Sequence, residues 1–369
     1  MSKIPELLVT ISGEKVGDKK TWENFRKREI LALFSEYVYG VRDIEKPVGQ
    51  FFKTKQETIF KGMRRKDIEV GFGDYSFPFS LYLPLKQDKP LPAIVFPVIE
   101  YHEENYEFDE AGNFVCKDLA TLRIPVKDIT ERGFAIAMMP TRNVYPDWEA
   151  HAEFRQGVFA AYNMPKERGK NAWATISAWA WGTSRVLDYL ETDGDIDCNN
   201  VAVGGHSRGG KMALWAAATD ERFKLSFSNN SGCMGAAVLR GKEGEHVKDI
   251  NITDWFCENF RDFNENEEML PVDQHMLIAL IAPRYVYVTS SSEDIWADPT
   301  AEYLACHMAS EAFELYGVKG IVAPEGKPMA DKVFSEGHIA YHLKTGTHSI
   351  TSYDWDNFLD YFDKIIKQS

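Results

Sequence analysis

The sequence predicts an α/β protein built on a doubly wound, mostly parallel sheet, with long insertions over one end of that sheet. Short apolar runs alternate along the chain with segments of helical periodicity, the order typical of parallel strands joined by helices. The run at 201–204 leads directly into a tight turn of small residues and then into an Ala-rich helical segment. Because the 369 residues contain no internal repeat, low-complexity tract or linker, we expect a single domain over residues 1–369.

The N-terminal part of the chain predicts a helix and a hairpin, which we expect at about 20–90 and packed on the main sheet. Residues 21–39 place apolar side chains on one helical face. Residues 77–83 alternate between apolar and other side chains, as in an antiparallel strand. The continuous apolar runs at 93–99 and 134–139 are typical of strands that are buried on both faces.

The rest of the chain predicts further strands and helices in alternation. Strands are expected at 225–227, 285–289 and 339–343, and helices at 173–190 and at about 355–366. Two irregular stretches, 100–118 and 140–169, are long for connections, and loops of this length are usually functional or mobile. We expect both to lie over the end of the sheet that carries the site.

The turn after 201–204 carries a motif with a mechanical explanation. Gly205-His206-Ser207-Arg208-Gly209 fits G-x-S-x-G, the nucleophile elbow of α/β-hydrolases, and it stands between a strand and a helix as that motif requires. Glycines beside the serine allow the strand and the helix to approach closely. We therefore predict an α/β-hydrolase fold with Ser207 as nucleophile. The alternative is a Gly-rich turn without chemistry, or one that holds a phosphate at a helix N-terminus, although no complete P-loop or dinucleotide pattern is present.

An elbow serine needs a base, and the base needs an acid to orient it. In this fold the acid and then the histidine follow the serine along the chain, after late strands. His348 lies in a polar loop where the last predicted strand ends, and the alternative is a histidine on a surface loop. Asp294 is the first candidate for the acid, with Glu293 and Asp298 as alternatives in the same loop.

The negative charge of a tetrahedral intermediate requires preorganised donors. The backbone N–H of Arg208, the residue after the nucleophile, is one expected donor, and the loop after Ile99 should supply a second. The side chain of Arg208 either adds a cationic donor or pairs with a surface carboxylate. We expect the side chain of His206 to pack away from the elbow.

The composition limits the location and the partners of the protein. A formal net charge of -14 disfavours nucleic acid and anionic membranes as partners. The five cysteines are scattered without C-x-x-C spacing, which argues against a zinc site or a disulfide framework, and we expect no metal or cofactor. The N-terminus lacks the pattern of a secretory signal and no apolar run is long enough to span a bilayer, so we expect a cytoplasmic protein. An export signal that had been removed would leave the same sequence.

Several blocks of the chain resemble a known family. Ser207-Arg208-Gly209-Gly210-Lys211 resembles the G-C-S-R-x-G-K signature of carbohydrate esterase family 15, the glucuronoyl esterases, with His206 where that family usually has Cys. Further blocks in the same order as in the family and its bacterial relatives, often labelled acetylxylan esterases, are Asn229-Asn230-Ser231-Gly232, 254–260, 270–275, Ala282-Pro283-Arg284 and 296–299. The similarity runs from about Trp22 to the C-terminus.

The resemblance implies a serine esterase that cleaves esters of 4-O-methyl-glucuronate on xylan, the linkage to lignin alcohols. It implies that Ser207 is the nucleophile and His348 the base. Arg208 would support the oxyanion with both its backbone and its side chain.

The same resemblance implies three substrate-binding residues. Lys211 would contact sugar hydroxyls, and Trp296 would form part of the sugar pocket. Glu258 would line that pocket. The alternatives are a solvated helix lysine, a core tryptophan and a glutamate that only caps a loop.

Two departures from the family pattern matter. Many members carry a catalytic Glu in a Gln-Glu-Ser-Gly block, where this chain has Asn230. An amide can orient an imidazole but does not stabilise the imidazolium as a charge does, so the acid is expected in the later loop, which favours Asp294. The second departure is the missing export signal, which favours small, imported glucuronate or acetyl esters over lignin–carbohydrate bonds outside the cell.

These observations predict a metal-free carbohydrate esterase that acts on a small-molecule or oligosaccharide ester of glucuronate through an acyl-enzyme. One alternative is an acetyl esterase for acetylated xylo-oligosaccharides. The other is a hydrolase-fold binding protein without turnover, against which an intact Ser207, His348 and acidic loop argue.

Overall fold

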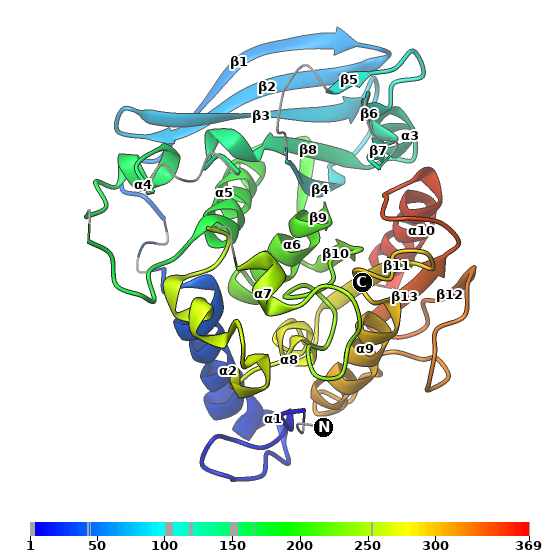
Figure 1. The fold of residues 1–369 in the computed structure, drawn as a ribbon. Coiled ribbons are helices and arrows are strands. Elements are labelled where there is room, and N and C mark those ends of the chain that lie inside the picture. Colours follow the sequence, from blue (N-terminus) through cyan, green and yellow to red (C-terminus); the bar gives the residue numbers. More distant parts are fainter. Residues whose placement is uncertain are drawn as a thin grey trace.

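The computed structural model describes residues 4–42, 44, 46–99, 106–117, 121–147, 154–165, 167–251 and 254–368 (Figure 1). The strands of its main sheet are β1 (Phe51–Phe60), β2 (Met63–Phe72), β3 (Tyr75–Pro84), β4 (Leu91–Val98), β8 (Ala135–Pro140), β9 (Ile196–His206), β10 (Leu225–Asn229), β11 (Tyr285–Ser291), β12 (Lys332–Phe334) and β13 (Ile339–Lys344). Its α-helices are α1 (Lys19–Thr21), α2 (Lys27–Phe34), α3 (Val126–Glu131), α4 (Gly157–Ala161), α5 (Thr175–Leu190), α6 (Arg208–Thr219), α7 (Val247–Ile250), α8 (Gln274–Ala279), α9 (Pro299–Glu314) and α10 (Ser352–Gln368).

The main sheet has ten strands in the order β1-β2-β3-β8-β4-β9-β10-β11-β13-β12. From β8 to β13 the neighbours in this order run parallel. The strands β1, β2 and β3 form an antiparallel meander at one edge, at the top of Figure 1, and β12 is antiparallel at the other edge. This is the predicted doubly wound, mostly parallel sheet, and the fold class is confirmed.

Helices cover both faces of the sheet because its central strands are apolar on both sides. In β4, Val95 packs in one hydrophobic cluster with α5 and α6, whereas its neighbour Phe96 packs in a second cluster with α3 and α10. Every residue of α5 is buried, so this helix lies within the core and has no solvent-exposed face. On the opposite face, Phe358 of α10 stacks on Phe227 of β10 at a centroid distance of 4.3 Å.

Some elements differ from the prediction for identifiable reasons. The sequence pattern predicts neither β1 nor β2, since almost every side chain of the edge strand β1 is exposed and the strand therefore has no apolar face. It also does not predict α9, whose buried face consists largely of small alanines such as Ala301, Ala305 and Ala309. The stretch 100–118, expected to be irregular, contributes β5 (Tyr106–Phe108) and β6 (Phe114–Cys116), which join β7 (Arg123–Ile124) in a small antiparallel sheet.

Parts of the two long predicted loops, at 100–105, 118, 148–153 and 166, lie outside the described residues. None of the helices in the described part of the chain combines the length and the apolar character that crossing a bilayer demands.

The turn from β9 to α6 has the backbone of a nucleophile elbow. Ser207 lies between the two elements with φ 57° and ψ -125°, a conformation that non-glycine residues rarely adopt. A Cβ atom at Gly205 would lie 2.2 Å from the backbone carbon and oxygen of Gly209. Only glycine at 205 therefore allows the end of β9 to meet the start of α6.

Replacing Gly205 by alanine is expected to lower the free energy of unfolding by about 2 kcal/mol or more, because the methyl group meets backbone that cannot rotate away. Gly194→Ala is the matched control, since a Cβ there meets nothing within 4 Å. Urea unfolding of both variants measures the difference. Equal stabilities of the two variants would show that the close approach at the elbow is not a constraint.

Candidate active site

The parallel strands bring four polar residues to one edge of the sheet. Ser207 follows β9, Asn230 follows β10, Asp294 lies beyond β11 and His348 beyond β13. Neighbouring parallel strands present their carboxyl ends together, where ligand sites of open α/β sheets lie. All four residues line one cavity of about 320 Å³. A second cavity of about 220 Å³ adjoins Ser207 and His348 and is otherwise mostly apolar.

Of the three acids considered for the site, the structure brings Asp294 to the histidine. Its Oδ2 lies 2.6 Å from Nδ1 of His348. The Asp294 side chain is buried, whereas 39% of the His348 side chain is exposed. His348 and Ser207 both line the two cavities described above. Glu293 is exposed, and Asp298 caps α9 by accepting a hydrogen bond from the backbone N–H of Ala301.

Asn230 lies in the block where the resemblance to the family implies a catalytic glutamate. Its buried side chain donates from Nδ2 to Ser291 Oγ at 2.8 Å and to the carbonyl oxygen of Ser349 at 3.3 Å. Both partners belong to the segments that carry Asp294 and His348. Asn230 therefore ties these two segments together.

A buried ionic network holds the segment that follows β13. The carboxylate of Asp354 accepts hydrogen bonds from His342 Nε2 at 3.0 Å and from the backbone N–H of Thr351 at 2.8 Å. Lys344 Nζ lies 2.9 Å from Asp354 and also donates to the carbonyl oxygen of Ser349 at 2.5 Å. The buried Lys344 thus holds the backbone of Ser349, the residue that follows His348.

The carboxylate of Asp354 stays ionised at neutral pH. Burial opposes ionisation of Asp354, but the hydrogen bond from His342 and the charge of Lys344 outweigh it and lower the pKa of the carboxyl group to about 2. Asp354 therefore remains a carboxylate over the range in which an esterase works.

His206 does not point away from the site, so this expectation was wrong. Its ring centroid lies 4.6 Å from that of His348, with 45° between the ring planes. The β9–β10 register pairs His206 with Asn229, whose Oδ1 lies 2.6 Å from His206 Nδ1. Because the Asn229 nitrogen donates to Asp354, its oxygen faces His206, and Nδ1 of His206 carries the proton.

Burial lowers the pKa of His206 to about 3. The ring is therefore neutral at working pH. A neutral ring packs against His348 without opposing the positive charge that a catalytic base acquires.

The side chain of Arg208 pairs with a carboxylate, although a buried one. Its Nη1 lies 2.6 Å from Oδ2 of Asp147, and the guanidinium carbon lies 5.0 Å from the ring centre of Trp255. Trp255 Nε1 donates to the other oxygen of Asp147 at 2.8 Å. Burial lowers the pKa of Arg208 to about 10, so the group stays cationic at neutral pH. The second expected oxyanion donor, after Ile99, lies outside the described residues.

Lys211 lines the cavity, but its hydrogen-bonding capacity is already used. Nζ donates to the carbonyl oxygens of Ser231 at 2.7 Å and Cys233 at 2.6 Å, and to Glu245 Oε2 at 3.1 Å. An ammonium group has three N–H donors, so a sugar hydroxyl would have to replace one of these bonds.

Glu245 joins Lys211 to Trp296. Its Oε1 accepts a hydrogen bond from Trp296 Nε1 at 3.2 Å, and Trp296 is 55% exposed at the edge of the cavity. The structure thus places Trp296 on the surface of the cavity and not in the core.

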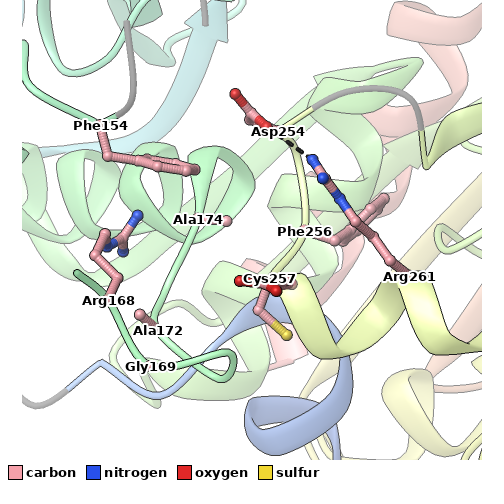
Figure 2. A pocket seen from close by; sticks show the side chains of 10 residues that line it. Phe154, Arg168, Gly169, Ala172, Ala174, Asp254, Phe256, Cys257 and Arg261 are labelled. Atoms are coloured by element: carbon pink, nitrogen blue, oxygen red, sulfur yellow. Dashed lines mark hydrogen bonds and ion pairs between the residues drawn. The ribbon is translucent and has the colours of Figure 1, made fainter. Parts of the chain in front are cut away.

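Glu258 does not lie in either cavity that contains Ser207. It lines a separate cavity, shown in Figure 2, together with Arg168, Asp254 and Arg261. Within the described residues, no group of three or more His, Cys, Asp or Glu side chains is placed to hold a metal ion.

Three residues of the site are not predicted from the sequence: Asp147, Glu245 and Trp255. Asp147 comes from an irregular stretch, and Glu245 belongs to a segment of mixed charge typical of a solvated loop. Trp255 stands in one of the family-like blocks, which is the signal that would have found it.

Asp294→Asn is expected to lower kcat about 10³- to 10⁴-fold, because a neutral amide does not stabilise the imidazolium of His348. Steady-state hydrolysis of an activated ester measures this loss. The controls Glu293→Gln and Asp298→Asn should keep wild-type kcat, since the first residue is exposed and asparagine also caps helices. Loss of activity in a control, with Asp294→Asn active, would assign the acid elsewhere.

The comparisons with known proteins agree on one family. The family model for fungal glucuronyl esterases matches residues 122–317. Carbohydrate esterase MZ0003, from an unknown prokaryotic organism, is 35% identical over 98% of this chain and 89% of its own length. The 4-O-methyl-glucuronoyl methylesterase of Podospora anserina is 34% identical over 83% of this chain and 59% of its own.

Solved structures give the same result. A glucuronoyl esterase from Solibacter usitatus superposes with a TM-score of 0.88 and 31% identity, covering 98% of both chains. A promiscuous esterase of carbohydrate esterase family 15 from a marine bacterial metagenome has a TM-score of 0.84 and 34% identity over 98% of this chain and 97% of its own. The chain therefore belongs to the glucuronoyl esterases of carbohydrate esterase family 15, carboxylic ester hydrolases with the α/β-hydrolase fold.

Proposed function

We propose that this protein hydrolyses esters of glucuronate, including 4-O-methyl-glucuronate, with Ser207 as nucleophile, His348 as base and Asp294 as the orienting acid. The observation that carries the proposal is the 2.6 Å contact between His348 and Asp294 beside a serine at a strained elbow. The relatives named 4-O-methyl-glucuronoyl methylesterase support the substrate class.

In this mechanism Ser207 Oγ attacks the ester carbonyl carbon while His348 takes its proton. Asp294 stabilises the resulting imidazolium, and the backbone N–H of Arg208 donates to the oxyanion. The tetrahedral intermediate collapses to an acyl-enzyme, and His348 gives the proton to the departing alcohol. His348 then removes a proton from water, which attacks the acyl group. As the second tetrahedral intermediate collapses, His348 returns this proton to Ser207 Oγ, and the free acid leaves.

The two cavities beside Ser207 offer separate space for the two halves of an ester. The cavity with Glu245 and Trp296 has polar groups and a tryptophan for a sugar ring. The second cavity, with Val98, Ile99 and Leu122 in its lining, suits an apolar alcohol.

The cations of the site are paired with carboxylates. Arg208 pairs with Asp147, and Lys211 pairs with Glu245. Neither cation therefore offers an uncompensated positive charge to an acidic sugar. An esterified uronate is itself uncharged, and hydrogen bonding rather than ion pairing selects it.

Benzyl glucuronate and p-nitrophenyl acetate distinguish the proposed activity from that of an acetyl esterase. We expect Trp296→Ala to lower kcat/KM for benzyl glucuronate about tenfold, the effect of losing one good contact, while hydrolysis of the acetate hardly changes. Ile295→Ala is the matched control, because this neighbour is also exposed but does not line the cavity. Equal sensitivity of both substrates to Trp296→Ala would favour the acetyl esterase.

A further inference from the structure

We propose that the cavity between residues 168–174 and 254–261 is a second binding subsite, which holds an uncharged sugar of the oligosaccharide that carries the glucuronate ester. The proposal rests on the proposed function of the Ser207 site. The cavity has a volume of about 340 Å³, at the lower end for small-molecule sites. Figure 2 shows its two walls, with Phe154 and Arg168 on one and Asp254, Phe256 and Arg261 on the other.

The subsite is adjacent to the proposed catalytic cavity. Trp255 lines the cavity of about 320 Å³ that contains Ser207, whereas its chain neighbours Asp254 and Phe256 line the proposed subsite. The segment 254–256 thus contributes to both linings and forms a wall that the two cavities share. Trp255 is fixed in that wall by its hydrogen bond to Asp147.

One wall presents a guanidinium group without a carboxylate partner. Arg168 stacks on Phe154 at 4.1 Å and on Phe159 at 4.8 Å, and one of its nitrogens donates to the carbonyl oxygen of Trp173. Among the described residues no carboxylate forms an ion pair with Arg168, and Asp254 of the opposite wall acts on it only through its charge. A guanidinium has five N–H donors, so Arg168 retains donors for a ligand.

The opposite wall supplies acceptors and another cation. Arg261 Nη2 lies 3.2 Å from Asp254 Oδ1, the pair joined by the dashed line in Figure 2. The exposed carboxylate of Glu258 forms no hydrogen bond or ion pair with the described residues. Acceptors and donors therefore face each other across the cavity.

The charge balance of the lining selects a neutral ligand. Two arginines and two carboxylates compensate each other, so an anion would meet Asp254 and Glu258 and a cation would meet Arg168 and Arg261. A polyhydroxylated ring uses donors and acceptors alike. The apolar side chains of Phe256 and Ala174 in the lining add surface for the C–H face of such a ring.

Two glucuronate esters that differ only in length test this subsite. The first is methyl glucuronate, and the second is the same methyl ester with the glucuronate attached to xylotriose. We expect Glu258→Ala and Arg261→Ala to lower the ratio of kcat/KM for the long ester to that for the short ester about tenfold, mainly through KM, as loss of a hydrogen bond to a charged group does. Both side chains are exposed, so both variants should fold.

Glu265→Ala is the matched control, an exposed acid of the same segment that does not line the cavity, and its ratio should equal that of the wild type. Wild-type hydrolysis of the short ester together with unchanged ratios in Glu258→Ala and Arg261→Ala would overturn the subsite. Failure of the wild type to hydrolyse either ester would instead overturn the proposed function. Calorimetry with Ser207→Ala and xylotriose gives a second readout, and binding of sulfate in place of xylotriose would overturn the assignment of a neutral sugar.

Discussion

The close approach of Gly205 to Gly209 is the constraint on which the site depends. A Cβ at 205 would lie 2.2 Å from the backbone of Gly209, and the absence of this atom lets β9 turn directly into α6. The turn holds Ser207 at a positive φ, between two cavities. The other parallel strands then need only end at the same edge for His348 and Asp294 to reach it.

Around this turn, buried charges are compensated pairwise. Arg208 pairs with Asp147, Lys211 with Glu245, and Lys344 with Asp354. Breaking any of these buried pairs would leave an uncompensated charge, an effect that commonly costs about 3–5 kcal/mol. His206, beside His348, adds no charge to the site because its ring is neutral. The positive charge that forms on His348 therefore faces Asp294 without a second cation in the neighbouring ring.

The sequence predicts the fold class, Ser207, His348 and Asp294 because these rest on a local motif and on the order of strands and loops along the chain. It does not predict Glu245 or Asp147, since their contacts with Lys211 and Arg208 join loops that are distant in sequence. His206 was misplaced because its direction depends on the pairing of β9 with β10, which fixes it against Asn229. Glu258 lies in the block 254–260 that resembles the family, and this resemblance implied a contact with the sugar. In the structure Glu258 lines the cavity beside residues 168–174, whereas Trp255 lines the cavity that contains Ser207.

The central claim is that Ser207 is a nucleophile activated by His348 and Asp294. Labelling with a fluorophosphonate, followed by intact-protein and peptide mass spectrometry, tests it without any choice of substrate. The account predicts a single adduct on Ser207 of the wild type, no adduct in Ser207→Ala, and labelling slowed by at least about 10²-fold in His348→Ala. A folded wild-type protein that stays unlabelled, or a His348→Ala variant that labels at the wild-type rate, would contradict it.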